Sequence, residues 1–234
     1  MQYRLSDSDT DSCGIARFFI MGKILNARMV LMRMIRDHPL SVDQEKFAYV
    51  IQMLLRSAAD AQKALDTDGL RGIEGNAAQL YFSVFDQMIL QNKKYFYFCG
   101  RIKRPPEDFV NAMLSFTYTI LAHDCASALE GAGLDPYVGF LHRDRPGRES
   151  LALDLMEELR SIYADRFVLT LINNRLMIPA HFQKKENGAV WLNDDGRTED
   201  SFGGMAEEKT DNDHSSVFAG ENLLGIDSLC AGSS

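Results

Sequence analysis

The sequence predicts a mainly α-helical protein with a short β-hairpin late in the chain and a poorly ordered tail. Up to about Asn174, apolar residues recur at three- and four-residue steps, which is the period of an amphipathic helix. Residues 182–192 then place Asn187-Gly188 between two short runs, a pair typical of a tight hairpin turn. Residues 196–234 are rich in Gly, Ser, Asp and Asn and show little periodicity. The 234 residues are enough for one sizeable core.

The first two helices are expected over residues 10–37 and 41–64. Pro39 ends the first, because proline cannot continue a helix. Ser41 with Gln44 resembles a capping box that opens the second. The expected core stripe of the first helix consists of Ile15, Phe18, Leu25, Met29 and Met32.

Three further helices are separated by a basic connector and a loop. The third is expected from Asp68 to about Leu90, with Thr67 as its cap. The connector over residues 91–104 comes next, and Pro105-Pro106 then open a fourth helix that reaches Glu130. After a loop, Ser150 caps a fifth helix that continues to about Asn174. The chain therefore divides into residues 1–40 (linker and first long helix), 41–178 (helical domain), 179–197 (hairpin) and 198–234 (tail).

Composition excludes several classes of protein. The chain has no run of 18 apolar residues, so a membrane span is excluded. Its first residues are soon followed by acidic ones, which does not fit a signal peptide. Four scattered cysteines form no CxxC pair, which argues against a disulfide framework or a cysteine zinc site and favours a reducing cytoplasm.

The net charge of −8 is unevenly placed. From Glu199 to the end the chain carries eight acids and one base, so the tail is −7 and the body only −1. A near-neutral body can still carry a basic face, and nucleic-acid binding therefore stays open.

Glu74 is the first candidate for chemistry. Gly72 and Gly75 flank it in an expected helix, where each glycine costs about 1 kcal/mol relative to alanine. Glycine is used where a backbone must approach something closely. Tight helix packing beside a solvated glutamate is the alternative interpretation.

A histidine and an acidic pair are the next candidates. His142 lies in the loop between two long helices, where a lone histidine is usually an ordinary surface or core group. Asp154 and Glu157 are three residues apart, so we expect both carboxylates on one helix face. Such a pair suits a hard divalent cation, although a solvated acidic face is the commoner explanation.

Together these residues predict a site for Mn²⁺ or Mg²⁺ with oxygen and nitrogen ligands. Such an ion polarises a phosphate and activates a hydroxyl for attack. The connector adds basic residues interleaved with aromatic ones, and this pattern can hold phosphates and stack bases. In the alternative, the aromatic side chains are core and the charges are merely solvated. The residues concerned are Lys93, Lys94, Tyr95, Phe96, Tyr97, Phe98, Arg101, Lys103 and Arg104, with Arg143, Arg145 and Arg148 beside His142.

Four blocks in the chain resemble, in order, the CRISPR-associated endonuclease and integrase of spacer acquisition, the Cas1 family, in the version that accompanies type I-C systems. The blocks are RGIEGNAAQLYF (71–82), RPPEDFVNAMLSFTYTIL (104–121), GFLHRDRPGRESLALDLMEELR (139–160) and FVLTLINNR (167–175). The opening QYRL…GKILNARMVLMR and the later FQKKENGAVWLNDDGR are also similar. The resemblance covers about Gln2 to Arg197.

The resemblance implies a helical, metal-dependent catalytic domain. Glu74 matches the Glu of the family's G-x-E-G block, His142 the His of its G-x-x-H loop, and Glu157 the acid of its D-L-M-E block. These three would be the metal ligands, with Asp154 as a neighbouring catalytic carboxylate. Whether His142 is only a ligand or also an acid–base group stays open. The implied reaction inserts short DNA duplexes into the repeat array by attack of a 3′-hydroxyl on a phosphodiester. The implied partners are DNA, a second copy of the chain and the small Cas2 protein.

The two ends depart from the family pattern. The resemblance begins near the family's interdomain linker, so we expect a fragment without the N-terminal β-rich domain that supplies much of the dimer contact. After Arg197 the sequence motifs of the family are missing, and we hypothesise that the tail is an out-of-frame translation. A truncated fragment that is inactive or only binds DNA is therefore the alternative function. An unrelated helical interaction module is a third interpretation, and it predicts that Glu74, His142 and Glu157 do not converge.

Overall fold

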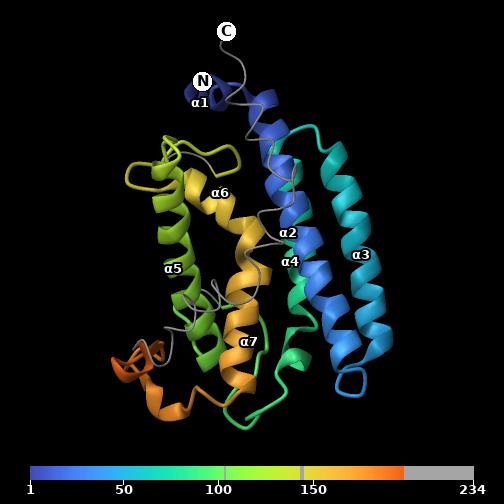
Figure 1. Ribbon diagram of the computed structural model, residues 1–234, viewed down its shortest axis with the longest axis vertical. Helices are drawn as coiled ribbons and strands as arrows, with labels where there is room; N and C mark the ends of the chain where they lie inside the picture. The colour runs from blue at the N-terminus through green and yellow to red at the C-terminus, as the bar shows by residue number, and fades with distance from the viewer. Residues whose placement is uncertain (103, 143–144, 198–234) are drawn as a thin grey trace.

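The computed structural model describes residues 1–102, 104–142 and 145–197 and shows a bundle of helices with one small hairpin (Figure 1). The predicted fold class is confirmed. The helices are α1 (Gln2–Ser6), α2 (Asp9–Asp37), α3 (Gln44–Lys63), α4 (Thr67–Phe82), α5 (Phe109–Gly131), α6 (Ser150–Leu159) and α7 (Arg166–Asn173). A π-helical turn, Arg160–Asp165, joins α6 to α7, and short 3-10 turns cover Phe85–Met88, Pro179–His181 and Asp195–Arg197.

The helices α6 and α7 lie between α5 on one side and α2 on the other (Figure 1). α3 packs on the far side of α2, and α4 contacts both. The core fills the space between these helices with fully buried side chains, among them Ile20, Leu54, Leu70, Met113 and Leu114. No helix in the described part of the chain is long and apolar enough to span a membrane.

The predicted core stripe of the first helix is wrong. Phe18, Met29 and Met32 are exposed, whereas Ile15 and Leu25 only pack against the edge of the core. The buried face of α2 carries Ala16, Ile20, Ile24, Ala27 and Leu31 instead. Apolar residues recur at helical steps on both faces of α2, so periodicity could not choose between them.

Aspartates, and not the predicted residues, are the N-caps of three helices. Asp43 accepts a hydrogen bond from the Lys46 amide at 3.0 Å, so Asp43 and not Ser41 is the N-cap of α3, which begins at Gln44. Asp66 caps α4 in place of Thr67. Asp108 caps α5 at Phe109, beyond the two prolines that were expected to open it. In each case the carboxylate satisfies an amide of the first turn that has no partner within the helix.

The end of the third helix and the continuity of the fifth also differ from prediction. α4 stops at Phe82 and is followed by a 3-10 turn, so the stretch to Leu90 is not one helix. The expected fifth helix is interrupted by the π-helical turn after Leu159. Glu149, and not Ser150, occupies its N-cap position.

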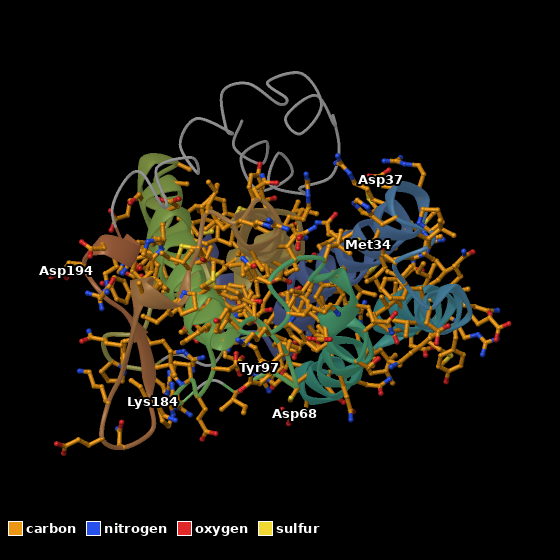
Figure 2. All side chains as sticks on the ribbon, turned by 90° about the horizontal axis from the view of Figure 1, so that it is seen from below. Met34, Asp37, Asp68, Tyr97, Lys184 and Asp194 are labelled. Atoms are coloured by element: carbon orange, nitrogen blue, oxygen red, sulfur yellow. The ribbon has the colours of Figure 1, made fainter. Side chains whose placement is uncertain are left out.

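The predicted hairpin is present at the edge of the bundle. β1 (Phe182–Lys184) pairs antiparallel with β2 (Val190–Leu192), and Gly188 supplies the positive φ of 81° that the turn requires. The ring of Phe182 stacks on that of Phe109 at a centroid distance of 4.3 Å, which ties the hairpin to the start of α5. Figure 2 shows Lys184 on this hairpin, on the opposite side of the bundle from α3. The hypotheses about residues 198–234 fall outside the described residues.

Candidate functional site

Two glutamates from different helices meet at one lysine. Glu74 projects from α4 and Glu157 from α6, and both carboxylates contact the Nζ atom of Lys23 on α2. The Glu157 Oε2 atom lies 2.6 Å from this nitrogen. The three side chains are largely buried, with exposed fractions of 26% for Glu74, 6% for Glu157 and 14% for Lys23. The carboxylate pair, Glu74 and Glu157, therefore converges on one cation position, which the Lys23 ammonium occupies.

Arg160 supplies a second positive charge to Glu157. Its guanidinium lies 2.9 Å from the Oε1 atom, so each oxygen of Glu157 has its own cationic partner. Burial alone would raise the pKa of Glu157, but the ammonium of Lys23 and the guanidinium of Arg160 outweigh it and lower the pKa to about 2. Glu157 is consequently an ionised carboxylate at every physiological pH.

His142 is held by Asp154 and not by the glutamates. Its ring Nδ1 lies 2.6 Å from Asp154 Oδ1, and its backbone amide donates to the same oxygen at 3.0 Å. The other oxygen of Asp154 accepts from the amides of Phe140 and Leu141 at 2.6 and 2.9 Å. Because Nδ1 is engaged, Nε2 is the ring nitrogen that is left for a ligand or a proton.

The loop that carries His142 is fixed from two further sides. Arg71, three residues before Glu74 on α4, donates to the carbonyl of Leu141. At the other side, the Gln2 amide donates to the carbonyls of Asp135 and Val138 at 2.8 and 3.0 Å. The first residues of the chain and the helix that carries Glu74 therefore both position this loop.

A small cavity with a mostly apolar lining adjoins the lysine contact. It has a volume of about 50 Å³, and its lining runs from Lys23 and Glu74 to Asp165. The buried polar atoms of this lining that have no hydrogen-bond partner include Arg101 Nε, Arg160 Nε and Ser161 Oγ. A cavity of this size has room for a few water molecules, and its polar atoms suit them.

The π-helical turn carries Asp165, a buried residue that lines this cavity. Burial raises the pKa of Asp165 to about 6, although Tyr118 donates a hydrogen bond to its Oδ1 and Arg160 and Arg101 lie nearby. A π-helical turn inside an α-helix adds a residue to the turn and rotates the residues after it, and such turns recur at functional sites. Here the turn begins at Arg160, three residues after Glu157.

The structure brings the predicted residues together in two groups. Glu74 and Glu157 share one cation position, and His142 is near enough to Glu157 to help lower its pKa. Asp154 and Glu157 are both buried on α6, as their spacing predicts, so the alternative of a solvated acidic face is wrong. Asp154 contacts the His142 loop with both its oxygens. Within the described residues, no three His, Cys, Asp or Glu side chains stand close enough to hold one metal ion in this arrangement.

The two glycines beside Glu74 have free space around them. A Cβ atom built on Gly72 or Gly75 would meet nothing within 4 Å. The alternative interpretation, tight helix packing within the protein, is therefore wrong. The backbone of α4 beside Glu74 is instead exposed.

The basic connector divides between core and surface. Phe96 and Phe98 are buried, as the alternative interpretation expects, but Tyr95 and Tyr97 are exposed beside Lys93 and Lys94. Arg101 points inward and donates to Asn111 at 2.8 Å. Lys103 and Arg143 lie outside the described residues.

Sequence reasoning missed Lys23, Arg71, Arg160 and Asp165. Lys23, Arg71 and Arg160 lie inside blocks that resemble the Cas1 family. The spacing of residues 23, 74 and 157 in the sequence does not predict that their side chains are in contact. Asp165 carried no signal at all, because it is a single acid in a helical stretch.

The fold and the site thus define a helical domain with a largely buried carboxylate pair that contacts a lysine ammonium. The family model described as "CRISPR associated protein Cas1" matches residues 1–199. The CRISPR-associated endonuclease Cas1 1 of Chlorobaculum tepidum is 50% identical over 196 residues, which make up 84% of this chain and 57% of that protein. The corresponding endonuclease of Leptospira interrogans is 41% identical over 85% of this chain and 78% of its own length.

Two solved structures have the same fold. A casposase bound to integration product superposes with a TM-score of 0.75 and 27% identity over 88% of this chain and 58% of its own. A partial Cas6-RT-Cas1–Cas2 complex superposes with a TM-score of 0.77 and 25% identity over 88% and 60%. The chain belongs to the CRISPR-associated Cas1 family. It spans 57% of the length of the Chlorobaculum relative.

Proposed function

We propose that the protein acts in CRISPR adaptation as a divalent-metal-dependent DNA endonuclease and integrase. The observation that carries this proposal is the carboxylate pair, which two separate helices bring to one cation position. The membership in a family whose relatives are named endonucleases supports it. In the proposed reaction, a 3′-oxygen forms a bond to phosphorus while the bond from that phosphorus to the leaving oxygen breaks.

The proposed metal is Mn²⁺ or Mg²⁺, held by Glu74, Glu157 and His142. The donors fit such an ion because the two carboxylates contact one position that already holds a cation, Glu157 has a lowered pKa, and an imidazole lies nearby. When bound, the metal stabilises negative charge on the attacked phosphate and activates the attacking oxygen.

The remaining side chains position these ligands. Asp154 holds the ring of His142 through Nδ1, so that Nε2 serves either as a ligand or as the group that exchanges a proton with the attacking or leaving oxygen. Arg160 keeps one oxygen of Glu157 engaged and orients the other toward the cation position. In this proposal Asp154 is a positioning residue.

The proposed partners are DNA, Cas2 and a second copy of this chain. The integration product bound to the casposase and the Cas2 of the partial complex support the first two, since both proteins share this fold. The exposed Lys93, Lys94, Tyr95 and Tyr97 offer charge and stacking surface for DNA. We also propose a cytoplasmic location, because the proposed reaction takes place on the cell's own repeat array.

The test is a nicking and strand-transfer assay with Mn²⁺ on branched DNA and on a short duplex with 3′-hydroxyl ends. We expect metal-dependent products that Glu74→Ala and Glu157→Ala abolish. Products that persist in Glu74→Ala would show that the ligands are assigned wrongly. DNA binding without any product would favour the second candidate function, a fragment that only binds DNA.

A further inference from the structure

The ammonium of Lys23 occupies the position where the carboxylate pair converges. It contacts one oxygen of Glu74 and lies 2.6 Å from Oε2 of Glu157. Lys23 comes from α2, 51 residues from Glu74 and 134 from Glu157 in sequence, so the contact is made by the fold and not by neighbouring positions in one helix.

Lys23 supplies one of the two positive charges in direct contact with the carboxylate pair. Glu74 and Glu157 contribute two negative charges, and Lys23 and Arg160 contribute two positive ones. Two ionised carboxylates packed together without a cation would repel each other, and burial strengthens that repulsion because water screens it less. Lys23 thus stabilises the carboxylate pair in the absence of metal.

A divalent ion cannot bind the pair while the ammonium stays. Carboxylate oxygens approach Mg²⁺ or Ca²⁺ to about 2.0–2.6 Å. An ion at that distance from both carboxylates would overlap the space of the Lys23 nitrogen, and the two positive charges would repel each other. The lysine stem is a flexible chain of four carbons and its side chain is 14% exposed, so the ammonium can leave without unfolding α2.

We propose that Lys23 is the resident cation of the metal-free site and competes with the divalent ion for Glu74 and Glu157. Binding of the ion releases the Lys23 ammonium. Glu74 and Glu157 are then free to act as two ligands of the ion, and the ammonium remains nearby as an unpaired positive charge. The competition also explains why the three proposed ligands do not converge while Lys23 is in place. This inference rests on the proposed metal site.

Metal affinity provides the test. Mn²⁺ binding to the metal-free full chain is measured by titration calorimetry and by electron paramagnetic resonance of the free ion. The proteins compared are the unmodified chain, Lys23→Met and the matched control Lys63→Met, whose lysine is exposed at the end of α3. We expect Lys23→Met to bind Mn²⁺ about tenfold more tightly or better, a ratio that corresponds to about 1.4 kcal/mol. Lys63→Met is expected to bind like the unmodified chain.

Thermal unfolding in EDTA and in Mn²⁺ gives a second readout. Lys23→Met should unfold at a lower temperature than the unmodified chain in EDTA. Addition of Mn²⁺ should raise the unfolding temperature of Lys23→Met more than that of the unmodified chain. Where Lys23→Met does not fold, Lys23→Gln replaces it, because a neutral amide can still donate to one carboxylate.

A third readout needs no mutation. Reductive methylation followed by peptide mass spectrometry measures how fast each lysine of the unmodified chain reacts. We expect Lys23 to react several-fold faster in Mg²⁺ than in EDTA, and Lys63 to react equally in both.

Three results are informative in different ways. If the unmodified chain binds Mn²⁺ and Lys23→Met binds it no more tightly, the competition is refuted while the metal site stands. If Lys23 reacts at the same rate with and without Mg²⁺, the ammonium is not released and the proposal fails. If neither protein binds Mn²⁺ and Glu74→Gln makes no difference, the metal site and the proposal fail together.

Discussion

The Nδ1 atom of His142 lies 2.6 Å from Oδ1 of Asp154, a carboxylate with no exposed surface. The same side chain accepts three backbone amides of the loop, at residues 140, 141 and 142. One buried aspartate therefore fixes both the course of the loop and the direction of the imidazole. The sequence predicts that Asp154 shares a helix face with Glu157, and the structure adds that its contacts anchor the histidine.

Replacing Asp154 tests this anchoring. Asp154→Ala leaves three amides without their acceptor, and each lost partner of a buried group costs about 1–3 kcal/mol. We expect a loss of several kcal/mol in the free energy of unfolding, measured in urea, together with loss of nicking. Asp154→Asn keeps one acceptor oxygen and should retain more stability than Asp154→Ala while weakening Mn²⁺ binding. Equal stability of Asp154→Ala and the unmodified chain would contradict the anchoring role.

Gly75 offers a test of what approaches Glu74. A Cβ at this position meets nothing within 4 Å, so Gly75→Ala should stabilise α4 by about 1 kcal/mol. For a domain of this size that corresponds to a rise of about 2–4 °C in the unfolding midpoint. If DNA lies against this backbone, the same substitution should lower nicking and strand transfer despite the higher stability.

Gly14→Ala is the matched control for Gly75→Ala. Gly14 is also in a helix with nothing within 4 Å of a built Cβ, nine residues from Lys23 along α2. It should give the stability gain without the loss of activity. Full activity in Gly75→Ala would show that DNA does not need the exposed backbone beside Glu74.

Asp165 makes stability depend on pH. Its pKa is raised from 3.8 to about 6, chiefly by burial. Between these values the folded state binds more protons than the unfolded state, so this group favours folding as the pH falls from 6 to 4 and opposes it above 6. At pH 7–8 the charged carboxylate costs up to about 3 kcal/mol, because a tenfold change in the acid dissociation constant corresponds to about 1.4 kcal/mol.

Asp165→Asn should therefore unfold at a higher temperature than the unmodified chain at pH 8. The Asn side chain is neutral at every pH and can still accept the hydrogen bond from Tyr118. The advantage should shrink steadily as the pH is lowered from 6 toward 4. A constant difference across pH 4–8 would mean that Asp165 does not titrate in this range.

The sequence located the residues of the site better than their relationships. Glu74, His142 and Glu157 stood out because each lies in a recognisable block, and Glu74 and Glu157 do share one cation position. Lys23 could not be predicted, since its two contacts span 51 and 134 residues and depend on how α2, α4 and α6 pack. The π-helical turn after Leu159 was equally hidden, because the apolar period continues through it.

The errors in the fold have local causes. Asp43, Asp66 and Asp108 are typical N-cap residues, but each has a competing start signal within one to three residues. For α2, small residues such as Ala16 and Ala27 form much of the buried face, and the larger Phe18 and Met29 lie exposed. Size and hydrophobicity therefore pointed to the wrong face, and only the packing of α3, α4 and α6 on α2 decides it.

Arg71 links the helix of Glu74 to the loop of His142. Its guanidinium donates to the carbonyl of Leu141 and pairs with Asp68. We expect Arg71→Ala to lower stability by only about 0.5–1.5 kcal/mol, the usual contribution of one hydrogen bond. Nicking should fall much further, by about tenfold or more, because displacing a catalytic group by about 1 Å can cost a hundredfold.

Asp68→Ala is the matched control for Arg71→Ala. It removes the ion pair between Arg71 and an aspartate whose side chain is 74% exposed, and it leaves the contact of Arg71 with Leu141 intact. Exposed ion pairs contribute little, so this control should be nearly neutral in both assays. If Asp68→Ala and Arg71→Ala lose activity equally, the ion pair and not the loop contact is what matters.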